Sequence, residues 1–217
     1  MIKFFKYLIE SIFIYIFFLI AKILGLNISR KLFSLIFCKV GPFIKSKKII
    51  EENLFRALGD RGDNQKIDII SKMWKNYGMT FVEYIYLYRF RNNNEHINIK
   101  GKEILNSISS NNKPVIFISG HFANFELMSM ELTKQDIKLA TIYRPLNNYF
   151  LNPFMEYLRK KYVCEKQIKK GISGIRETIQ HLNNGYNIAL MVDQRLGEGK
   201  KLNFFKQEAY TTTLPAQ

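Results

Sequence analysis

The sequence contains few of the residues that build metal centres and cross-linked secreted folds. Its 217 residues include two cysteines, Cys38 and Cys164, and three histidines. The two cysteines lie far apart without the paired spacing of a zinc site, and two thiols alone do not indicate a disulfide framework. We therefore expect two reduced, buried thiols and no metal cofactor.

Acidic residues are also scarce. Lysine and arginine outnumber aspartate and glutamate by 33 to 18, which gives a net charge of +15. This excess favours anionic partners: acidic proteins, phospholipid surfaces, phosphorylated substrates or nucleic acid. We find no recognised nucleic-acid-binding module, and the hydrophobic N-terminus argues against nucleic acid. With 47% hydrophobic residues the chain can bury a real core, and its length indicates one domain with an appended segment.

A cleavage site of the A-x-A type is missing after the apolar N-terminal run, so we expect this run to be retained. The stretch "SIFIYIFFLIA" (11–21) extends with its neighbours to nearly 20 residues, borderline for spanning a bilayer core of about 30 Å. Flanking lysines suit anionic headgroups. A buried core helix is the alternative, but a helix apolar on all faces at a terminus has little protein to bury it. We predict a membrane-anchor helix over residues 1–30, spanning or interfacial.

Two helical stretches follow. The segment "KKIIEENLFRAL" (47–58) has apolar residues at helical spacing, and the glycines and polar residues of "GDRGDN" (59–64) end it. The second stretch (67–90) is long and rich in aromatic residues. We interpret it as a core-packing helix.

After residue 100 the pattern changes to alternating strands and helices. Strands are predicted at 114–119, 137–144, 163–168 and 187–194. Helices are predicted at 125–132, at 148–162 with an interruption near Pro153, and at 171–185. Such alternation predicts an α/β fold with a mostly parallel central sheet covered by helices, preceded by the hydrophobic N-terminal membrane-associated helix.

Each predicted strand ends in a charged or titratable group. The four strand ends are Ser119-Gly120-His121, Tyr143-Arg144-Pro145, Lys169-Lys170 and Asp193-Gln194-Arg195. In open α/β sheets, ligand sites form in the crevice outside the carboxyl ends of the strands. We therefore expect a site at this edge.

His121 and Glu126 are five residues apart, so a continuous helix would aim them at different faces. If Gly120 permits a bend and Asn124 caps the next helix, His121 lies in the loop and Glu126 in the first helical turn. The carboxylate could then hold one imidazole nitrogen while the other faces substrate, as a general base requires. For a lone histidine, a structural hydrogen bond is the alternative.

The stretch "GHFANFE" (120–126) resembles the Gly-His-Phe-Gly-Asn-Trp-Glu block of the bacterial lipid A biosynthesis acyltransferases, the lauroyl and myristoyl transferase family. Ala123 and Phe125 depart from that pattern. Lys206, where the family usually has glycine, and Glu208, where it often has proline, are further departures. Other blocks follow in family order and cover essentially the whole chain: "IYRPLNN" (142–148), "YLRKKY" (157–162), "MVDQ" (191–194) and "FFKQEAYTTTLPA" (204–216).

The resemblance implies acyl transfer from an acyl-carrier-protein thioester to a hydroxyl of a lipid A precursor. The reaction would take place on the cytoplasmic side of the bacterial inner membrane, among inner membrane lipids, without a cofactor or a covalent acyl-enzyme. His121 would be the base and Glu126 its orienting partner. Substrate-binding residues would be Arg144, Arg159, Asp193, Asn124 and Gln194.

Several alternatives remain. Arg159 also fits a solvated helix face, and Asp193 fits an arginine partner that holds the site together. One alternative function is that of a glycerolipid acyltransferase, which shares the His-x4-acid motif but normally has aspartate in place of Glu126. Another is a non-catalytic, membrane-tethered protein that binds anionic lipid through its net positive charge alone. Because the family usually continues for several tens of residues beyond "TTTLPAQ" (211–217), the resemblance implies that residues 31–217 form an acyltransferase α/β domain truncated at its C-terminus.

Overall fold

A computed structural model of the chain describes residues 1–110, 113–193, 199–204 and 206–211. The chain divides into two compact units. The first contains residues 1–20 and 84–193, and the second contains residues 21–83 and 194–217.

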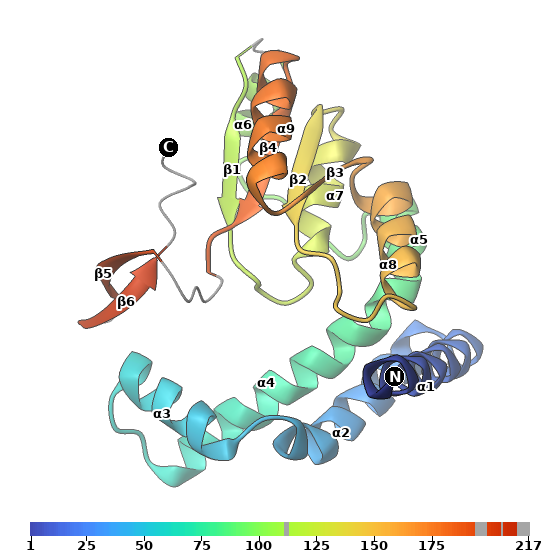
Figure 1. Cartoon of the computed structure of the whole chain (residues 1–217), viewed down its shortest axis with the longest axis vertical. Coiled ribbons are helices and arrows are strands. Elements are labelled where there is room, and N and C mark those ends of the chain that lie inside the picture. The colour runs from blue at the N-terminus through green and yellow to red at the C-terminus, as the bar shows by residue number, and fades with distance from the viewer. Residues whose placement is uncertain (111–112, 194–198, 205, 212–217) are drawn as a thin grey trace. The chain divides into compact units, whose positions relative to one another are not determined.

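The first unit is built around a parallel sheet of four strands, which confirms the predicted fold class (Figure 1). The order across the sheet is β1 (Ile116–Ser119), β4 (Asn187–Met191), β2 (Leu139–Tyr143) and β3 (Lys166–Lys169). The strand of this sheet that comes last in the sequence, β4, thus lies between the first two. Its register with β1 pairs Ser119 with Met191, so the carboxyl ends of these two strands meet.

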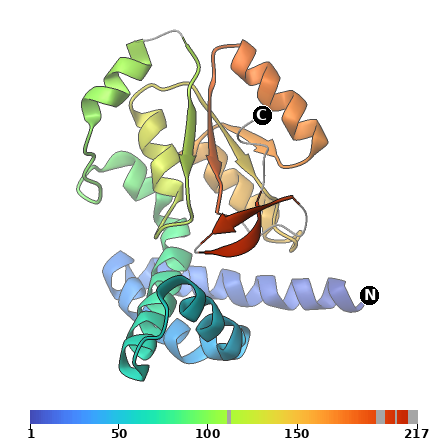
Figure 2. The same ribbon diagram turned by 90° about the vertical axis from the view of Figure 1, so that its left-hand side faces the viewer.

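Helices cover both faces of this sheet. Helix α9 (Ile172–Asn183) lies on one face and α7 (Glu126–Lys134) on the other, as the two views together show (Figure 1 and Figure 2). Right-handed crossovers require this arrangement, since β1 to β2 and β3 to β4 run in opposite directions across the sheet. The remaining helical elements of this unit are η1 (Tyr84–Tyr86), α5 (Leu87–Asn92), α6 (Lys102–Ser110), α8 (Asn152–Leu158) and the π-helical turn η2 (Arg159–Val163).

The core of the first unit lies on β2, β3 and β4. Ala140, Ile168 and Ile188 are almost fully buried and pack with Leu182 of α9. Asn187 fixes the amino ends of the strands, because its Oδ1 accepts from the Val115 N–H and its Nδ2 donates to Lys138 O. The Asn187 backbone N–H also donates to Lys138 O at 2.8 Å, so this one residue joins the beginnings of β1, β2 and β4.

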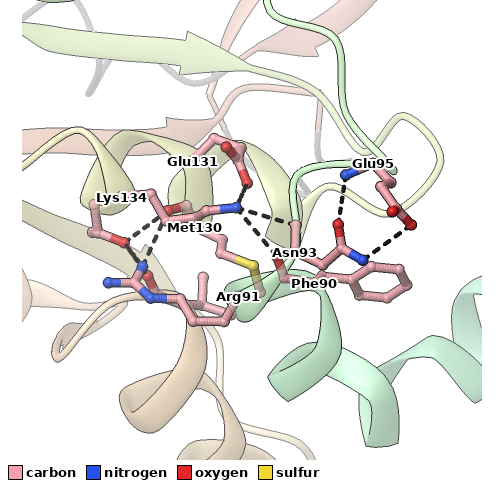
Figure 3. Close-up of polar contacts among 9 residues, drawn as sticks. Phe90, Arg91, Asn93, Glu95, Met130, Glu131 and Lys134 are labelled. Carbon is pink, nitrogen blue, oxygen red and sulfur yellow. Dashed lines mark hydrogen bonds and ion pairs between the residues drawn. The ribbon is translucent and has the colours of Figure 1, made fainter.

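Helix α5 is attached to α7 by two basic side chains (Figure 3). Lys134 of α7 donates to the backbone oxygens of Phe90 and Asn93 at the end of α5, and it also pairs with Glu131 at 2.8 Å. Arg91 reaches in the opposite direction and donates to Met130 O. A cation at a helix C-terminus satisfies its unpaired carbonyls, so Lys134 acts as a cap for α5.

Helix α1 (Ile2–Leu24) confirms the predicted hydrophobic N-terminal helix and, by length and composition, could cross a membrane. Within the first unit it packs on the segment before α8. Tyr15 Oη donates to Phe150 O, Asn148 Nδ2 donates to Tyr7 O, and the rings of Tyr15 and Phe154 meet edge to face. Large apolar side chains of α1 remain exposed: Ile2, Phe5, Ile9, Ile12, Phe13, Ile16 and Leu19.

The second unit contains α2 (Leu26–Ile44), α3 (Lys47–Leu58) and α4 (Asp63–Glu83), and the antiparallel hairpin β5 (Lys200–Phe204) and β6 (Gln207–Thr211). The predicted helix over 67–90 is therefore divided at Glu83, where α4 gives way to η1. Helices α2 and α4 approach closely because Gly78 lies against the backbone of Phe33, where a Cβ atom would overlap the carbonyl. Arg30 pairs with the buried carboxylate of Glu83 at 2.7 Å.

One helix prediction is wrong in its detail. Pro153 was expected to interrupt a helix over 148–162, but it occupies the first turn of α8, where its missing N–H has no intrahelical partner to lose. The irregularity comes instead at η2, where the Cys164 N–H bonds to Arg159 O five residues back.

Candidate functional site

His121 and Asp193 lie together at the carboxyl ends of β1 and β4. Ser119 and Met191 are register partners in the two parallel strands, and each titratable residue follows its partner by two positions. The ring Nδ1 of His121 lies 2.7 Å from Asp193 Oδ1, and the His121 backbone N–H donates to Oδ2, also at 2.7 Å. One carboxylate therefore holds both the backbone and the ring of the histidine.

This contact defines the state of the imidazole. An ionised carboxylate only accepts hydrogen bonds, so Nδ1 carries the proton and, in the neutral ring, Nε2 presents a lone pair. Partial burial disfavours ionisation of Asp193, but the hydrogen bonds from the His121 backbone and ring outweigh it and hold the pKa of this carboxyl below its ordinary value. The His121 side chain is 35% exposed, and its ring meets Phe125 edge to face.

Two small residues shape the loop around His121. A Cβ atom at Gly120 would lie 2.9 Å from the Phe122 ring and 3.1 Å from Asp193 Oδ2, so glycine admits the carboxylate. The turn itself occurs at Ala123, whose φ of 44° lies in the left-handed region that favours glycine. A tight turn also begins at Gly120, where a bend is expected, because the Phe122 N–H donates to Gly120 O at 2.9 Å.

Glu126 is buried in a different cluster. Its Oε1 accepts from Arg159 Nε at 2.7 Å and from Tyr84 Oη at 2.9 Å, and the Arg159 Nη2 lies 2.6 Å away. The Glu126 and Arg159 side chains are 8% and 13% exposed. Burial and the neighbouring Glu126 charge raise the pKa of Tyr84. Burial opposes the charge on Arg159, but Glu126 and Tyr84 outweigh it and raise the pKa of the guanidinium.

The expected hydrogen bond between His121 and Glu126 is therefore not formed. Among the described residues, no hydrogen bond or ion pair joins these two side chains. The physical reason is that Glu126 neutralises a buried guanidinium, while the strand register places Asp193 beside the ring. Arg159 does not lie on a solvated helix face, so that alternative is also wrong. The carboxylate that pairs with Arg159 is Glu126, whereas Asp193 contacts His121.

Asn124 does not cap α7 as predicted. The helix begins at Glu126 with Phe125 at its N-cap and no side-chain capping bond. Asn124 is buried, and its backbone oxygen accepts from the Leu127 N–H at 3.1 Å. Gln194, the other predicted amide contact to substrate, lies outside the described residues.

Arg144 follows β2 at the same edge of the sheet and is exposed, with a 3.4 Å hydrogen bond to Asn147. Beside it, Tyr143 Oη donates to Glu156 at 2.6 Å, and Lys169 lies 4.0 Å from the same carboxylate. The hydrogen bond from Tyr143 holds the pKa of Glu156 below its ordinary value. Basic groups are thus available to an anionic ligand at this edge.

Tyr84 was not singled out by its sequence, since it belongs to an aromatic stretch that reads as core packing. Only its spatial position against Glu126 and Arg159 distinguishes it. The pairing of His121 with Asp193 had one readable signal, because both residues stand at strand ends. The described residues contain no group of three or more His, Cys, Asp or Glu side chains arranged to hold a metal ion.

The fold and site define an α/β protein with an imidazole oriented by a carboxylate at the carboxyl ends of parallel strands. The sequence model of the bacterial lipid A biosynthesis acyltransferases matches residues 2–217, so the chain belongs to this family. Over 118 residues it is 30% identical to lipid A biosynthesis acyltransferase 2 of Shigella flexneri. This alignment covers 54% of the chain and spans 36% of that relative's length.

Proposed function

We propose that the protein transfers a fatty acyl chain from an acyl-carrier-protein thioester to a hydroxyl of a lipid A precursor. Membership of the family supports acyl transfer in lipid A biosynthesis. The observation that carries the mechanism is the contact of His121 with Asp193 at the sheet edge, where α/β proteins bind ligands.

In the proposed reaction, His121 is the general base. Its Nε2 takes the proton from the acceptor hydroxyl, while Asp193 fixes the tautomer and stabilises the imidazolium that forms. The acceptor oxygen then attacks the thioester carbonyl. When the tetrahedral intermediate collapses, the carbon–sulfur bond breaks and the imidazolium returns its proton to the departing thiolate.

Glu126 takes a positioning role in this proposal. It binds Arg159 and Tyr84 at the first residue of α7, five residues after the histidine, and so anchors the end of the loop that carries His121. Arg144 is exposed at the neighbouring strand end, where it could contact phosphate on the acceptor or on the prosthetic arm of the carrier protein. In the proposed reaction, the basic groups of this edge also stabilise the oxyanion of the tetrahedral intermediate.

Direct transfer without a covalent acyl-enzyme is supported by the state of Cys164. This thiol is buried and donates to Leu139 O at the amino end of β2, away from the strand ends that carry His121. Burial raises its pKa to about 11, so the nucleophilic thiolate is disfavoured at neutral pH. A buried, protonated thiol supports a route in which the acceptor hydroxyl, activated by His121, attacks the thioester directly.

We place the protein at the bacterial inner membrane, with the active site on its cytoplasmic side. Helix α1 supports an interfacial position over a spanning one. One face bonds to Asn148 and Phe150, while the opposite face exposes apolar side chains such as Ile9 and Ile16. A helix that lies in the interface buries such a stripe in lipid while its other face stays on protein.

An acyl-transfer assay tests this function. The purified protein is incubated with acyl-carrier-protein thioester and a tetraacylated lipid A precursor, and wild type is compared with His121→Ala. Loss of about 10²- to 10⁴-fold in rate is expected when a general base is removed. Equal transfer by wild type and His121→Ala would contradict the mechanism. Faster transfer to a lysophospholipid acceptor than to the lipid A precursor would assign the glycerolipid alternative.

A further inference from the structure

A basic cavity lies at the end of the sheet opposite the candidate active site. It has a volume of about 360 Å³ and is lined by residues before β2, before β3 and before β4, where the strands begin. The proposed chemistry takes place at the strands' carboxyl ends. This cavity is therefore a separate site within the first unit.

Positive charge dominates the lining. The lining contains five basic side chains and one carboxylate, that of Glu165, which is already paired with Lys166 at 2.7 Å. The basic side chains are Arg91, Lys138, Lys160, Lys161 and Lys166. Like charges at one concave site repel unless an anion is bound between them, and cavity walls focus their field.

The cations come from separate elements that the fold holds in place. Arg91 projects from the end of α5 and donates to Met130 O and Thr133 Oγ1 of α7, as Figure 3 shows in part. The Thr133 hydroxyl in turn lies 2.8 Å from Val163 O at the end of η2. This chain of bonds fixes the guanidinium against the cavity before any ligand arrives.

The π-helical turn η2 supplies the next part of the wall. Arg159, its first residue, points to the buried Glu126, whereas Lys160 and Lys161 follow it into the cavity lining. π-turns are rare and occur frequently at functional sites. Among the described residues, the ammonium groups of Lys138 and Lys160 make no hydrogen bond or ion pair, so both are available to a ligand.

We propose that this cavity binds a phosphate group. A planar guanidinium suits two phosphate oxygens at once, and lysine ammoniums add point charges with mobile donors. Tyr162 and Tyr186 also line the cavity and offer phenolic groups. The phosphate can belong to a soluble ester or to a lipid headgroup, since the recognised chemistry is the same.

Isothermal titration of the full chain with inorganic phosphate, at constant ionic strength maintained with chloride, tests the site. The variant Lys138→Ala/Lys160→Ala removes two exposed cations of the lining. Lys100→Ala/Lys102→Ala is the matched control, because it removes the same charge at exposed positions outside the cavity. We expect saturable binding that the cavity variant weakens about tenfold or more, as the loss of two charge-assisted hydrogen bonds implies, and that the control retains.

Vesicle flotation separates the two sources of phosphate. Vesicles of phosphatidylcholine alone are compared with vesicles that also contain phosphatidic acid. A lipid source predicts that the cavity variant loses the phosphatidic-acid-dependent part of binding, whereas a soluble source predicts loss in the titration only. Equal weakening in the cavity and control variants, or no phosphate binding by wild type, would overturn the proposal. Binding of an acidic protein through Lys138 and Lys160, without any binding of phosphate, would also overturn it.

Discussion

Asp193 holds His121 at two points, the backbone N–H and the ring Nδ1, with both distances at 2.7 Å. Because the two residues stand at the same offset beyond paired strand ends, the contact is a product of sheet register. A carboxylate fixed in this way orients the ring without a long, flexible side chain.

Titration of Asp193 provides a first check of this contact. Its folded-state pKa is depressed, so its contribution to stability is present above an unfolded value of about 3.9 and is lost as pH falls through the folded value. The contribution is small because the side chain is 42% exposed. Carbon-13 NMR of the carboxyl should give a midpoint below about 3.9 in wild type and a higher one in His121→Ala. Equal midpoints would mean that the ring does not stabilise the carboxylate.

The buried pair of Glu126 and Arg159 should contribute most to the stability of the loop that carries His121. Arg159→Met leaves a carboxylate buried without its cation, so we expect a loss of about 3 to 5 kcal/mol in the free energy of unfolding. Tyr84→Phe removes the hydrogen bond that the hydroxyl donates to Glu126 and the weaker one that it accepts from Arg159, and it should cost about 1 to 2 kcal/mol. Urea unfolding measures both. If the double variant Glu126→Gln/Arg159→Met is no more stable than Arg159→Met, the unpaired charge is not the cause.

Ala123 and Lys206 have left-handed backbone angles, with φ of 44° and 62°. Both positions carry glycine in the pattern that the sequence resembles. Ala123→Gly should therefore stabilise the protein by roughly 0.5 to 1 kcal/mol, because relief of the strained φ outweighs the added freedom of the unfolded chain. Ala57→Gly within α3 is the control and should destabilise by about 1 kcal/mol. Destabilisation by both substitutions in urea unfolding would contradict this.

Cys164 should resist alkylation in the folded protein. Its pKa is raised to about 11 by burial, so the thiol stays protonated until pH approaches that value. Mass spectrometry after iodoacetamide treatment at pH 8 should find no label on Cys164 unless denaturant is added, and Cys164→Ser assigns the peptide. Rapid labelling without denaturant would show an accessible thiolate and reopen the question of an acyl-enzyme.

Charges on the exposed stripe of α1 should release the protein from membranes. Ile9→Glu/Ile16→Glu places carboxylates at positions that are 53% and 46% exposed and point away from the contacts with residues 148–154. Each isoleucine that the membrane buries contributes about 1.5 to 3 kcal/mol to binding, so the loss of two predicts at least a hundredfold weaker vesicle binding. Gln180→Glu/Asn183→Glu on α9 carries the same charge change at exposed sites and should bind as wild type does. Unchanged flotation of the α1 variant would remove this helix from the proposal.

The sequence predicted the four strands of the first unit and that their sheet is parallel, because apolar runs bounded by turns carry that information. It did not predict the hairpin of β5 and β6, whose residues are mostly exposed and form no apolar run. It did not predict the order of strands, since β4 inserts between β1 and β2 through contacts far apart in the chain. For that reason the sequence indicates Glu126, five residues away, as the partner of His121, whereas the structure has Asp193 there. The same limitation concealed Tyr84, whose role depends on where α7 and η2 bring their charged side chains.

A double-mutant cycle in the acyl-transfer assay tests the central claim most directly. If Asp193 acts only through His121, Asp193→Asn should lower kcat by roughly 10²- to 10⁴-fold, and His121→Ala/Asp193→Asn should be no slower than His121→Ala alone. Independent contributions predict instead that the two losses multiply. A kcat for Asp193→Asn within about twofold of wild type would contradict the account, whatever the effect of His121→Ala.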